Sequence, residues 1–237
     1  MSQPLKKPRH IGIVAASPEG ASLCYRELSR HIHKLVGDTG HPAISLHNEP
    51  LEEYLAAIDR DDWHYVGELF VKSANALKAC GADFCITPEN LMQHAVHLAE
   101  PKSPIPWLSM ADLVAKSVLE AGHKTVGLIG TKLVMFGSTY QALLGIRGVK
   151  VIAPEAKDAQ MIDASIFNEL VHGEVTLESQ SQWLEAFGRL KARGAEGVIL
   201  GCTEAPLLIG PVHSPLPVYD STAILAEGTA RYALGLG

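Results

Sequence analysis

The chain has 237 residues, a formal net charge of −6 and a composition that is 47% hydrophobic and 19% charged. A chain of this length can bury one large core or two smaller ones. The mildly acidic balance disfavours nucleic acid as a partner, because binding to phosphates requires a basic surface. No stretch reaches the roughly 18 consecutive apolar residues that a membrane-spanning helix needs, so we expect no membrane partner either.

The first residues and the cysteines predict a cytoplasmic protein. The basic run at residues 6–10 is not followed by an apolar segment, so it predicts a solvated leader rather than a signal peptide. Four cysteines, Cys24, Cys80, Cys85 and Cys202, show no zinc-ligand spacing. We expect reduced thiols, with Cys24, Cys80 and Cys85 acting as small buried hydrophobic residues.

Strand-like and helix-like segments alternate along the first half of the chain. Apolar residues recur at helical spacing between residues 62 and 80, for example, and Gly81 then ends the helix. In chain order we expect a strand at 11–15, a helix at about 21–36, a strand at 43–46, a helix at 62–80, a strand at 84–87, a helix at about 90–99, an extended segment at 105–108 and a helix at 111–121.

The same order of segments restarts in the second half. Strand-like runs at 125–130, 149–152, 197–200 and 216–220, the last followed by a helix at 223–226, match the four extended segments of the first half. The run LKACGAD at 77–83 is echoed about 113 residues later by LKARGAE at 190–196. Any two βα units look somewhat alike, but four matched segments in one order indicate a duplication.

The alternation predicts an α/β fold with two similar Rossmann-like parallel-sheet domains related by pseudo-twofold symmetry. We expect residues 1–107, joined by 216–237, to form one domain and residues 108–215 the other. Ligands of open α/β sheets bind beyond the carboxyl ends of the strands or between domains, so the active site is expected in the cleft between the halves.

The residues that follow the predicted strands are hydroxyls, amides, a carboxylate and a thiol. They are Ala16-Ser17-Pro18, His47-Asn48, Glu89-Asn90, Thr131 and Cys202-Thr203-Glu204. No glycine-rich phosphate loop accompanies them, and no histidine or cysteine pair has the spacing of metal ligands. We therefore expect no cofactor and no metal. The 113-residue register aligns Glu89 with Cys202 and Asn90 with Thr203, so each half supplies one proton-exchanging side chain.

Cys202 is the strongest candidate for chemistry. It ends an apolar strand and precedes Thr203-Glu204-Ala205-Pro206, which we expect to start a helix. A thiol at a helix N-terminus meets free N–H donors and the positive end of the helix dipole, which lower the pKa of the thiol from about 8.5. The alternative is a structural cysteine in the core.

The Cys202 motif carries a family resemblance. The run VILGCTEAPLL at 198–208 resembles the second cysteine motif of the cofactor-independent aspartate/glutamate racemase family. Weaker matches are spread over most of the chain: SPE at 17–19 with Tyr25-Arg26, GLIGT at 127–131 followed by Met135 and Tyr140, IFNEL at 166–170 and PVYDS at 217–221.

The resemblance implies a mechanism and a set of binding residues. Such enzymes hold an amino acid between two similar domains and use no pyridoxal phosphate. One base removes the α-proton, and a second group returns a proton to the opposite face. By analogy Asn90 and Thr203, the residues after the two bases, bind the substrate carboxylate. Ser17, Asn48, Leu91 and Thr131 would complete the pocket.

Two positions depart from the family pattern. Where the family usually has Cys-Asn-Thr, this chain has Glu89-Asn90-Leu91, so the first base becomes a carboxylate. Glu89 would need a raised pKa to donate a proton, and burial or a nearby Cys202 thiolate would raise it. The alternative is that Glu89 caps a helix beginning at Asn90. Met161 stands where an ungapped register puts the family's substrate-binding lysine, which argues against acidic substrates.

The leading prediction is a two-base amino-acid racemase or epimerase with Cys202 and Glu89 on opposite faces of the α-carbon. One alternative is an enzyme that uses Cys202 alone, similar to arylmalonate decarboxylase, maleate isomerase or hydantoin racemase. Another is an inactive relative that only binds a ligand. We expect a small-molecule partner, an amino acid or a related carboxylic acid, and a homodimer, as the family typically forms.

Overall fold

The computed structural model describes residues 7–210 and 212–236, so residue 6, the first of the basic run, lies outside the described residues. The chain divides into two compact units. One contains the residues up to Met110 and the C-terminal residues from Leu225; the other is Ala111–Ile224. The domain boundaries expected at 107/108 and 215/216 stay a prediction. Across the described parts of the chain, none of the helices combines the length and the apolar character that a bilayer crossing demands.

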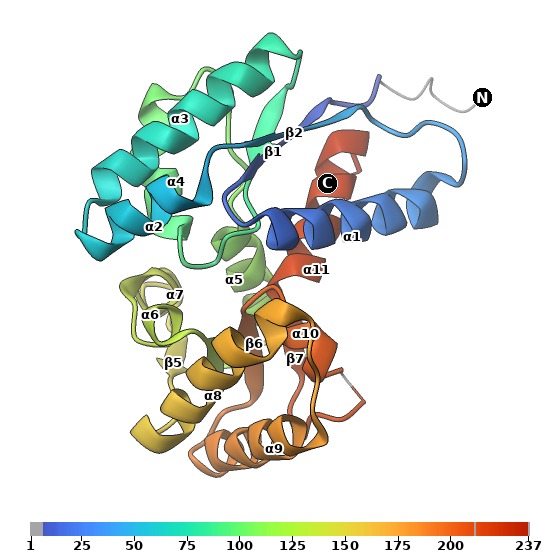
Figure 1. Cartoon of the computed structure of the whole chain (residues 1–237). Helices are drawn as coiled ribbons and strands as arrows, with labels where there is room; N and C mark the ends of the chain where they lie inside the picture. The colour runs from blue at the N-terminus through green and yellow to red at the C-terminus, as the bar shows by residue number, and fades with distance from the viewer. Residues whose placement is uncertain (1–6, 211, 237) are drawn as a thin grey trace. The chain divides into compact units, whose positions relative to one another are not determined.

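The first unit is built on a parallel sheet of order β2-β1-β3. Figure 1 shows β1 and β2 in blue. The elements of this unit are β1 Ile11–Ala15, α1 Pro18–Val36, β2 Ile44–Asn48, α2 Leu51–Asp59, α3 Trp63–Ala79, β3 Phe84–Ile86, α4 Gln93–Ala99 and a 3-10 helix Glu100–Lys102. An isolated bridge between Cys85 and Trp107 extends the sheet beyond β3.

Strands β1 and β3 of this first sheet are buried on both faces, whereas the edge strand β2 is partly exposed. Val14 and Cys85 face a core formed with α2, α3 and α4, in which Tyr54 and Phe70 are fully enclosed. Residues of opposite orientation on the same strands, such as Phe84, face the other side, where the ring of Tyr232 packs edge-on at 4.8 Å. Burial on both faces explains why β1 and β3 are continuous apolar runs.

The second unit is built on a parallel sheet of order β5-β4-β6-β7. Its core packs β4 and β6 against α8 and α9 around the fully buried Trp183. Its elements are α5 Met110–Glu120, β4 Thr125–Gly130, α6 Lys132–Met135, α7 Ser138–Gly145, β5 Lys150–Ile152, α8 Ala156–Asn168, a 3-10 helix Leu170–His172, α9 Leu177–Ala192, β6 Gly197–Gly201, α10 Ala205–Leu208 and β7 Val218–Asp220. Helix α11, Ser221–Leu234, begins in this unit, and from Leu225 onward it belongs to the first unit. The predicted α/β fold with two parallel sheets is confirmed.

The duplicated heptapeptide, residues 77–83 and 190–196, has the same conformation and the same role in each unit. Ala82 N donates to Leu77 O, and Ala195 N donates to Leu190 O. The intervening glycines, Gly81 and Gly194, have φ of +91° and +93°, a conformation that side chains disfavour. Each repeat therefore ends a helix through a left-handed glycine and leads the chain into the following strand.

The acidic residue that closes each repeat ties it to the first strand of its own sheet. Asp83 Oδ2 accepts the backbone N–H of His10 at 2.7 Å, before β1. Glu196 Oε2 accepts the backbone N–H groups of Lys124 and Thr125 at the start of β4. The repeated heptapeptide therefore makes the same tertiary contact in each unit.

Several helix limits differ from the predicted ones. Helix α1 begins at Pro18, three residues early, because the Ser17 hydroxyl caps it by accepting Gly20 N–H. Helix α4 begins at Gln93 rather than at Asn90. Helices α2, α6, α7, α8 and α9 were not predicted, although Leu51, Tyr54 and Leu55 give α2 an apolar face at helical spacing.

Candidate active site

Cys202 lies directly after β6, at the carboxyl edge of the second sheet. Gly201, the last residue of β6, pairs with Gly130, the last residue of β4. The next residues, Cys202 and Thr131, therefore leave the sheet side by side. The backbones are close here, because a Cβ placed on Gly130 would lie 2.7 Å from Gly201 O. A glycine pair is required for this close approach, and it sets the position of the Cys202 backbone.

The thiol of Cys202 contacts a carboxylate. Cys202 is only 7% exposed, and its Sγ donates a hydrogen bond to Glu204 Oε2 over 3.1 Å. Burial and the Glu204 carboxylate raise the pKa of the Cys202 thiol well above its ordinary value, and hydrogen bonds from the N–H groups of Glu204 and Ala205 act in the opposite direction. The resting form is therefore the thiol, which is a proton donor.

The predicted lowering of the Cys202 pKa is wrong. The helix that follows is α10, a single turn of four residues whose N-cap is Glu204 rather than Thr203. Such a short helix has a weak dipole, and its N-cap residue brings a negative charge to the sulfur. Desolvation and the like charge outweigh the two backbone donors.

Hydroxyl groups accompany Cys202 at the same edge. Thr131 Oγ1 is buried and has no hydrogen-bond partner among the described residues. Although Thr131 is the N-cap of α6, its side chain does not cap that helix. Thr203 follows Cys202 in the turn before α10. The second unit thus brings together Cys202, Thr203 and Thr131, three of the predicted site residues.

Glu89 lies beyond the carboxyl end of β3 in the first unit, where it is partly exposed. Its Oε1 accepts the backbone N–H of Ser17 over 2.8 Å. Ser17 is the N-cap of the 19-residue helix α1, so the carboxylate sits at the positive end of a long helix. The Glu89 carboxylate is thereby tied to the start of α1.

The helix-cap alternative for Glu89 is wrong in the form predicted. Helix α4 begins at Gln93, its N-cap is Met92, and no side chain caps it. Residues 90–92 form a turn in which Met92 N donates to Glu89 O over 3.2 Å. The carboxylate of Glu89 instead contacts α1, through Ser17. Asn90 is buried in this turn and Leu91 is partly buried.

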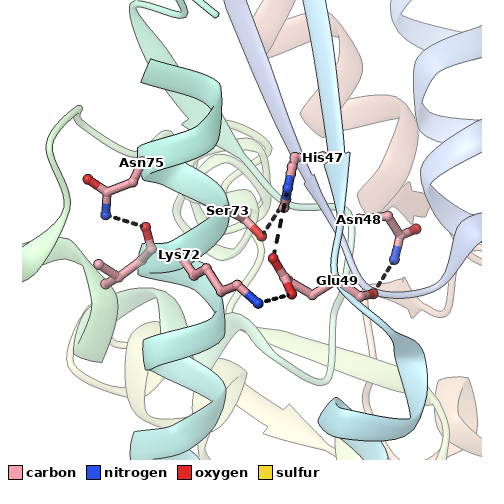
Figure 2. Close-up of polar contacts among 7 residues, drawn as sticks. His47, Asn48, Glu49, Lys72, Ser73 and Asn75 are labelled. Atoms are coloured by element: carbon pink, nitrogen blue, oxygen red, sulfur yellow. Dashed lines mark hydrogen bonds and ion pairs between the residues drawn. The ribbon is translucent and has the colours of Figure 1, made fainter. Parts of the chain in front are cut away.

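Asn48 ends β2, which pairs with β1 so that Asn48 lies opposite Ala15. Its Nδ2 donates to Ala16 O at 3.3 Å and to Glu49 O, and these bonds hold the strand ends together. Figure 2 shows that the neighbouring side chains turn toward α3: Glu49 is paired with Lys72 at 2.6 Å, and His47 Nδ1 lies 3.1 Å from Ser73 Oγ. Ser17, Glu89 and Asn48 thus lie at one edge of the first sheet.

The other cysteines divide into two groups. Cys24 and Cys85 are fully buried, and burial raises the pKa of each to about 12, with the Glu89 charge adding to the effect on Cys24. These thiols are structural, as predicted. Cys80 is exposed at the end of α3, so the prediction that it is a buried hydrophobic residue is wrong.

Met161 lies on α8 and packs, partly buried, against the core of the second unit. It lines a hollow of about 400 Å³ with Gln182 and Arg189 of α9, next to the ion pair of Arg189 with Asp158. Its expected place opposite a substrate carboxylate stays a prediction. The described residues include no group of three or more side chains arranged to hold a metal ion.

Comparison with known proteins identifies the family. The Asp/Glu/hydantoin racemase profile matches residues 13–229, nearly the whole chain. The chain belongs to this family. It is 24% identical to the broad specificity amino-acid racemase RacX of Bacillus subtilis, over 92% of this chain and 96% of that protein.

Solved structures agree with this racemase fold. An aspartate racemase homologue from Pyrococcus horikoshii superposes with a TM-score of 0.85 at 25% identity, over 95% of this chain and 99% of the other. Glutamate racemase from Francisella tularensis, solved in complex with D-glutamate, shares the fold with a TM-score of 0.64 at 14% identity, over 98% and 84% of the two chains.

Two residues of this racemase-family chain were missed by sequence reasoning. Glu204 contacts the Cys202 thiol, but the pattern suggested only that it lay near a helix start. The side chain of Gln93 is almost fully buried and donates hydrogen bonds to the backbone on either side of Pro88. A polar residue in the apolar run of α4 was the available signal, because a buried amide requires partners.

Proposed function

We propose that this chain is a cofactor-independent amino-acid racemase or epimerase of the aspartate/glutamate type, in which Glu89 and Cys202 exchange protons with opposite faces of the α-carbon. The observation that carries the proposal is the protonation of Cys202, which burial and the contact with Glu204 hold as a thiol. We propose that Glu89, whose carboxylate accepts the Ser17 N–H, is the base that complements it. A racemase needs one acid and one base at rest.

In the proposed step, Glu89 removes the α-proton and the electron pair of the C–H bond moves into the substrate carboxylate, giving an enediolate. The Cys202 S–H then delivers its proton to the opposite face of the carbon. The products are the inverted amino acid, a protonated Glu89 and a Cys202 thiolate. The reverse reaction starts from this second form of the enzyme, with the thiolate as base.

The second form is disfavoured by the same contacts. A Cys202 thiolate would face the Glu204 carboxylate, and a protonated Glu89 would lose the charge that Ser17 N–H stabilises. The enzyme therefore returns to its resting form by moving a proton from Glu89 to Cys202, through solvent or through Glu204. We expect the two directions of turnover to depend differently on pH, because each direction starts from a different form.

The enediolate carries two negative charges on the substrate carboxylate, and it requires donors. We propose Asn90 and Thr203 for this role, with Thr131, whose buried hydroxyl makes no hydrogen bond to a described residue. Ser17, Asn48 and Leu91 would complete the pocket. The Ser17 N–H donates to Glu89 and its hydroxyl oxygen accepts Gly20 N–H, so the O–H hydrogen of Ser17 is the group it would offer to a substrate.

The proposed substrates are neutral as well as acidic amino acids. Met161 in the expected place of a lysine weakens the case for a side-chain carboxylate, and the relative in Bacillus subtilis is named a broad specificity racemase. A panel of the twenty common amino acids, each incubated with the protein in deuterium oxide, tests the proposal. We expect deuterium at the α-carbon of at least one; none exchanging would reject racemisation.

Two variants test the roles of the bases. Cys202→Ser should slow α-proton exchange by roughly 10²- to 10⁴-fold, the usual contribution of a general acid–base group. Glu89→Gln keeps an oxygen that can accept the Ser17 N–H but removes the base. The rate of α-proton exchange should therefore fall more for the enantiomer whose α-proton faces Glu89 than for the other enantiomer. Circular dichroism confirms that each variant is folded.

An enzyme that uses one thiol is the second candidate. The preference of Cys202 for the protonated form suits the protonation of an enediolate left by decarboxylation, and Glu89 would then serve only to hold Ser17. Under this alternative Glu89→Gln keeps full activity, and phenylmalonate releases carbon dioxide. A homodimer and a cytoplasmic location stay predictions, and light scattering after size exclusion tests the first.

A further inference from the structure

We infer that Gln93 is a positioning residue for Glu89, and this inference rests on the proposed function. The Gln93 side chain is 1% exposed, at the first residue of α4. Its Nε2 donates to Thr87 O and to Glu89 O, each at 3.2 Å. One amide therefore binds both carbonyl groups that flank Pro88.

The segment around Pro88 needs such a donor. Pro88 has no backbone N–H, and it lies after β3, where the ladder of strand hydrogen bonds has ended. A buried carbonyl without a partner costs about 1–3 kcal/mol. The Glu89 carbonyl receives Met92 N–H as well, whereas Gln93 reaches across the proline to the Thr87 carbonyl. The amide thus fixes the turn from both sides.

The anchor of this turn is rigid. Helix α4 packs closely on α3 at Gly67, where an added Cβ would lie 3.2 Å from Leu98 Cβ. Gln93 transmits this fixed position to the backbone of Glu89, and the Glu89 carboxylate then meets Ser17 N–H at 2.8 Å. A displacement of about 1 Å would break that bond, and misplacement on this scale can cost a reaction about 10²-fold.

The Ser17 amide reports on Glu89 without any substrate. We expect Gln93→Met, which keeps the length of the side chain and removes both donors, to speed hydrogen exchange of the Ser17 N–H about tenfold, as the loss of one to two hydrogen bonds predicts. Ser17 belongs to α1 and lies 76 positions from Gln93 in the chain, so a defect confined to α4 would leave its exchange unchanged. If Gln93→Met does not fold, Gln93→Glu, which replaces the donor by an acceptor, should give the same result.

Ser165→Ala is the matched control. Ser165 is also buried, and its hydroxyl donates to Ile162 O and accepts Trp183 Nε1–H, each at 2.8 Å, in the second unit. This variant should lower the melting temperature without changing the exchange of Ser17. Unchanged Ser17 exchange in the folded Gln93 variants, within twofold of the wild type, overturns the positioning role.

Kinetics separates this role from the proposed function. With an amino acid from the panel that the wild type turns over, Gln93→Met should lower kcat at least tenfold and change KM less than threefold. The substitution shifts the Glu89 carboxylate relative to the α-carbon and leaves the affinity for the amino acid largely unchanged. If Ser17 exchange responds but the wild type turns over no amino acid, the proposed function fails and the positioning of Glu89 stands. If turnover is present and neither Ser17 exchange nor kcat responds, the positioning role fails alone.

Discussion

The contact between Cys202 and Glu204 makes a quantitative prediction. Removing the charge with Glu204→Gln should lower the pKa of the Cys202 thiol, because the carboxylate destabilises the thiolate 3.1 Å away. Coulomb's law at this distance gives about 5 kcal/mol for an effective dielectric constant of about 20, and about 1.3 kcal/mol in water. Glu204 is partly exposed, so we expect solvent screening to bring the interaction to about 1.5–3 kcal/mol and the pKa of the Cys202 thiol to fall when the charge is removed.

Burial is the larger cause of the raised pKa and remains in the variant. The Cys202 pKa of Glu204→Gln should therefore fall but stay above the ordinary value. The assay is the rate of alkylation by iodoacetamide as a function of pH, followed by mass spectrometry of the peptide that contains Cys202. The exposed Cys80 would react first, so both proteins carry Cys80→Ser.

The control for a general loss of negative charge is Glu185→Gln, an exposed residue on α9 that pairs with Arg189 at 3.5 Å. It should leave the alkylation profile of Cys202 unchanged. An unchanged or higher midpoint in Glu204→Gln would refute the reasoning and would mean that desolvation alone keeps Cys202 protonated. The predicted fall also bears on function, because a more acidic thiol is a better proton donor but a weaker base in the reverse direction.

Three further predictions concern stability. Glu196 has a lowered pKa because it accepts N–H bonds from Lys124 and Thr125, so its contribution is present above the ordinary glutamate pKa and is lost as pH falls through the lowered value; Glu196→Gln should reduce the melting temperature at pH 7 and much less at pH 3. Gly130→Ala should cost about 1–3 kcal/mol in urea unfolding and slow α-proton exchange, since the new methyl group would push the backbone of β6 away. Lys72→Met should lower the melting temperature, because it leaves the buried Glu49 carboxylate without the Lys72 ammonium group, and adding Glu49→Gln should recover most of this loss in a double-mutant cycle.

The local contacts of the site explain why sequence reasoning succeeded only in part. The apolar run before Cys202 and the glycine turns at Gly81 and Gly194 are local signals, and they place both strand ends correctly. The charge state of Cys202 is not local, because its largest cause is the burial of the thiol, which the packing of the whole unit decides.

Glu89 is a second residue whose position was predicted from local sequence signals but whose contact was not. The sequence suggested either a base or a cap for the helix that follows it, because acidic residues are common before helices. The carboxylate accepts the backbone N–H of Ser17, 72 residues earlier. Such a contact arises because β1 and β3 are neighbours in a parallel sheet, so residues after both strands emerge at one edge.

The sequence by itself determined the alternation of strands and helices, the duplication, and the residues that end the strands, because periodicity, glycine turns and repeats act over short distances along the chain. Only the tertiary structure decided that Cys202 is buried as a thiol and that the Glu89 carboxylate accepts the Ser17 N–H. Burial sets the pKa of a thiol, and Ser17 and Glu89, 72 residues apart, meet only once β1 and β3 have paired.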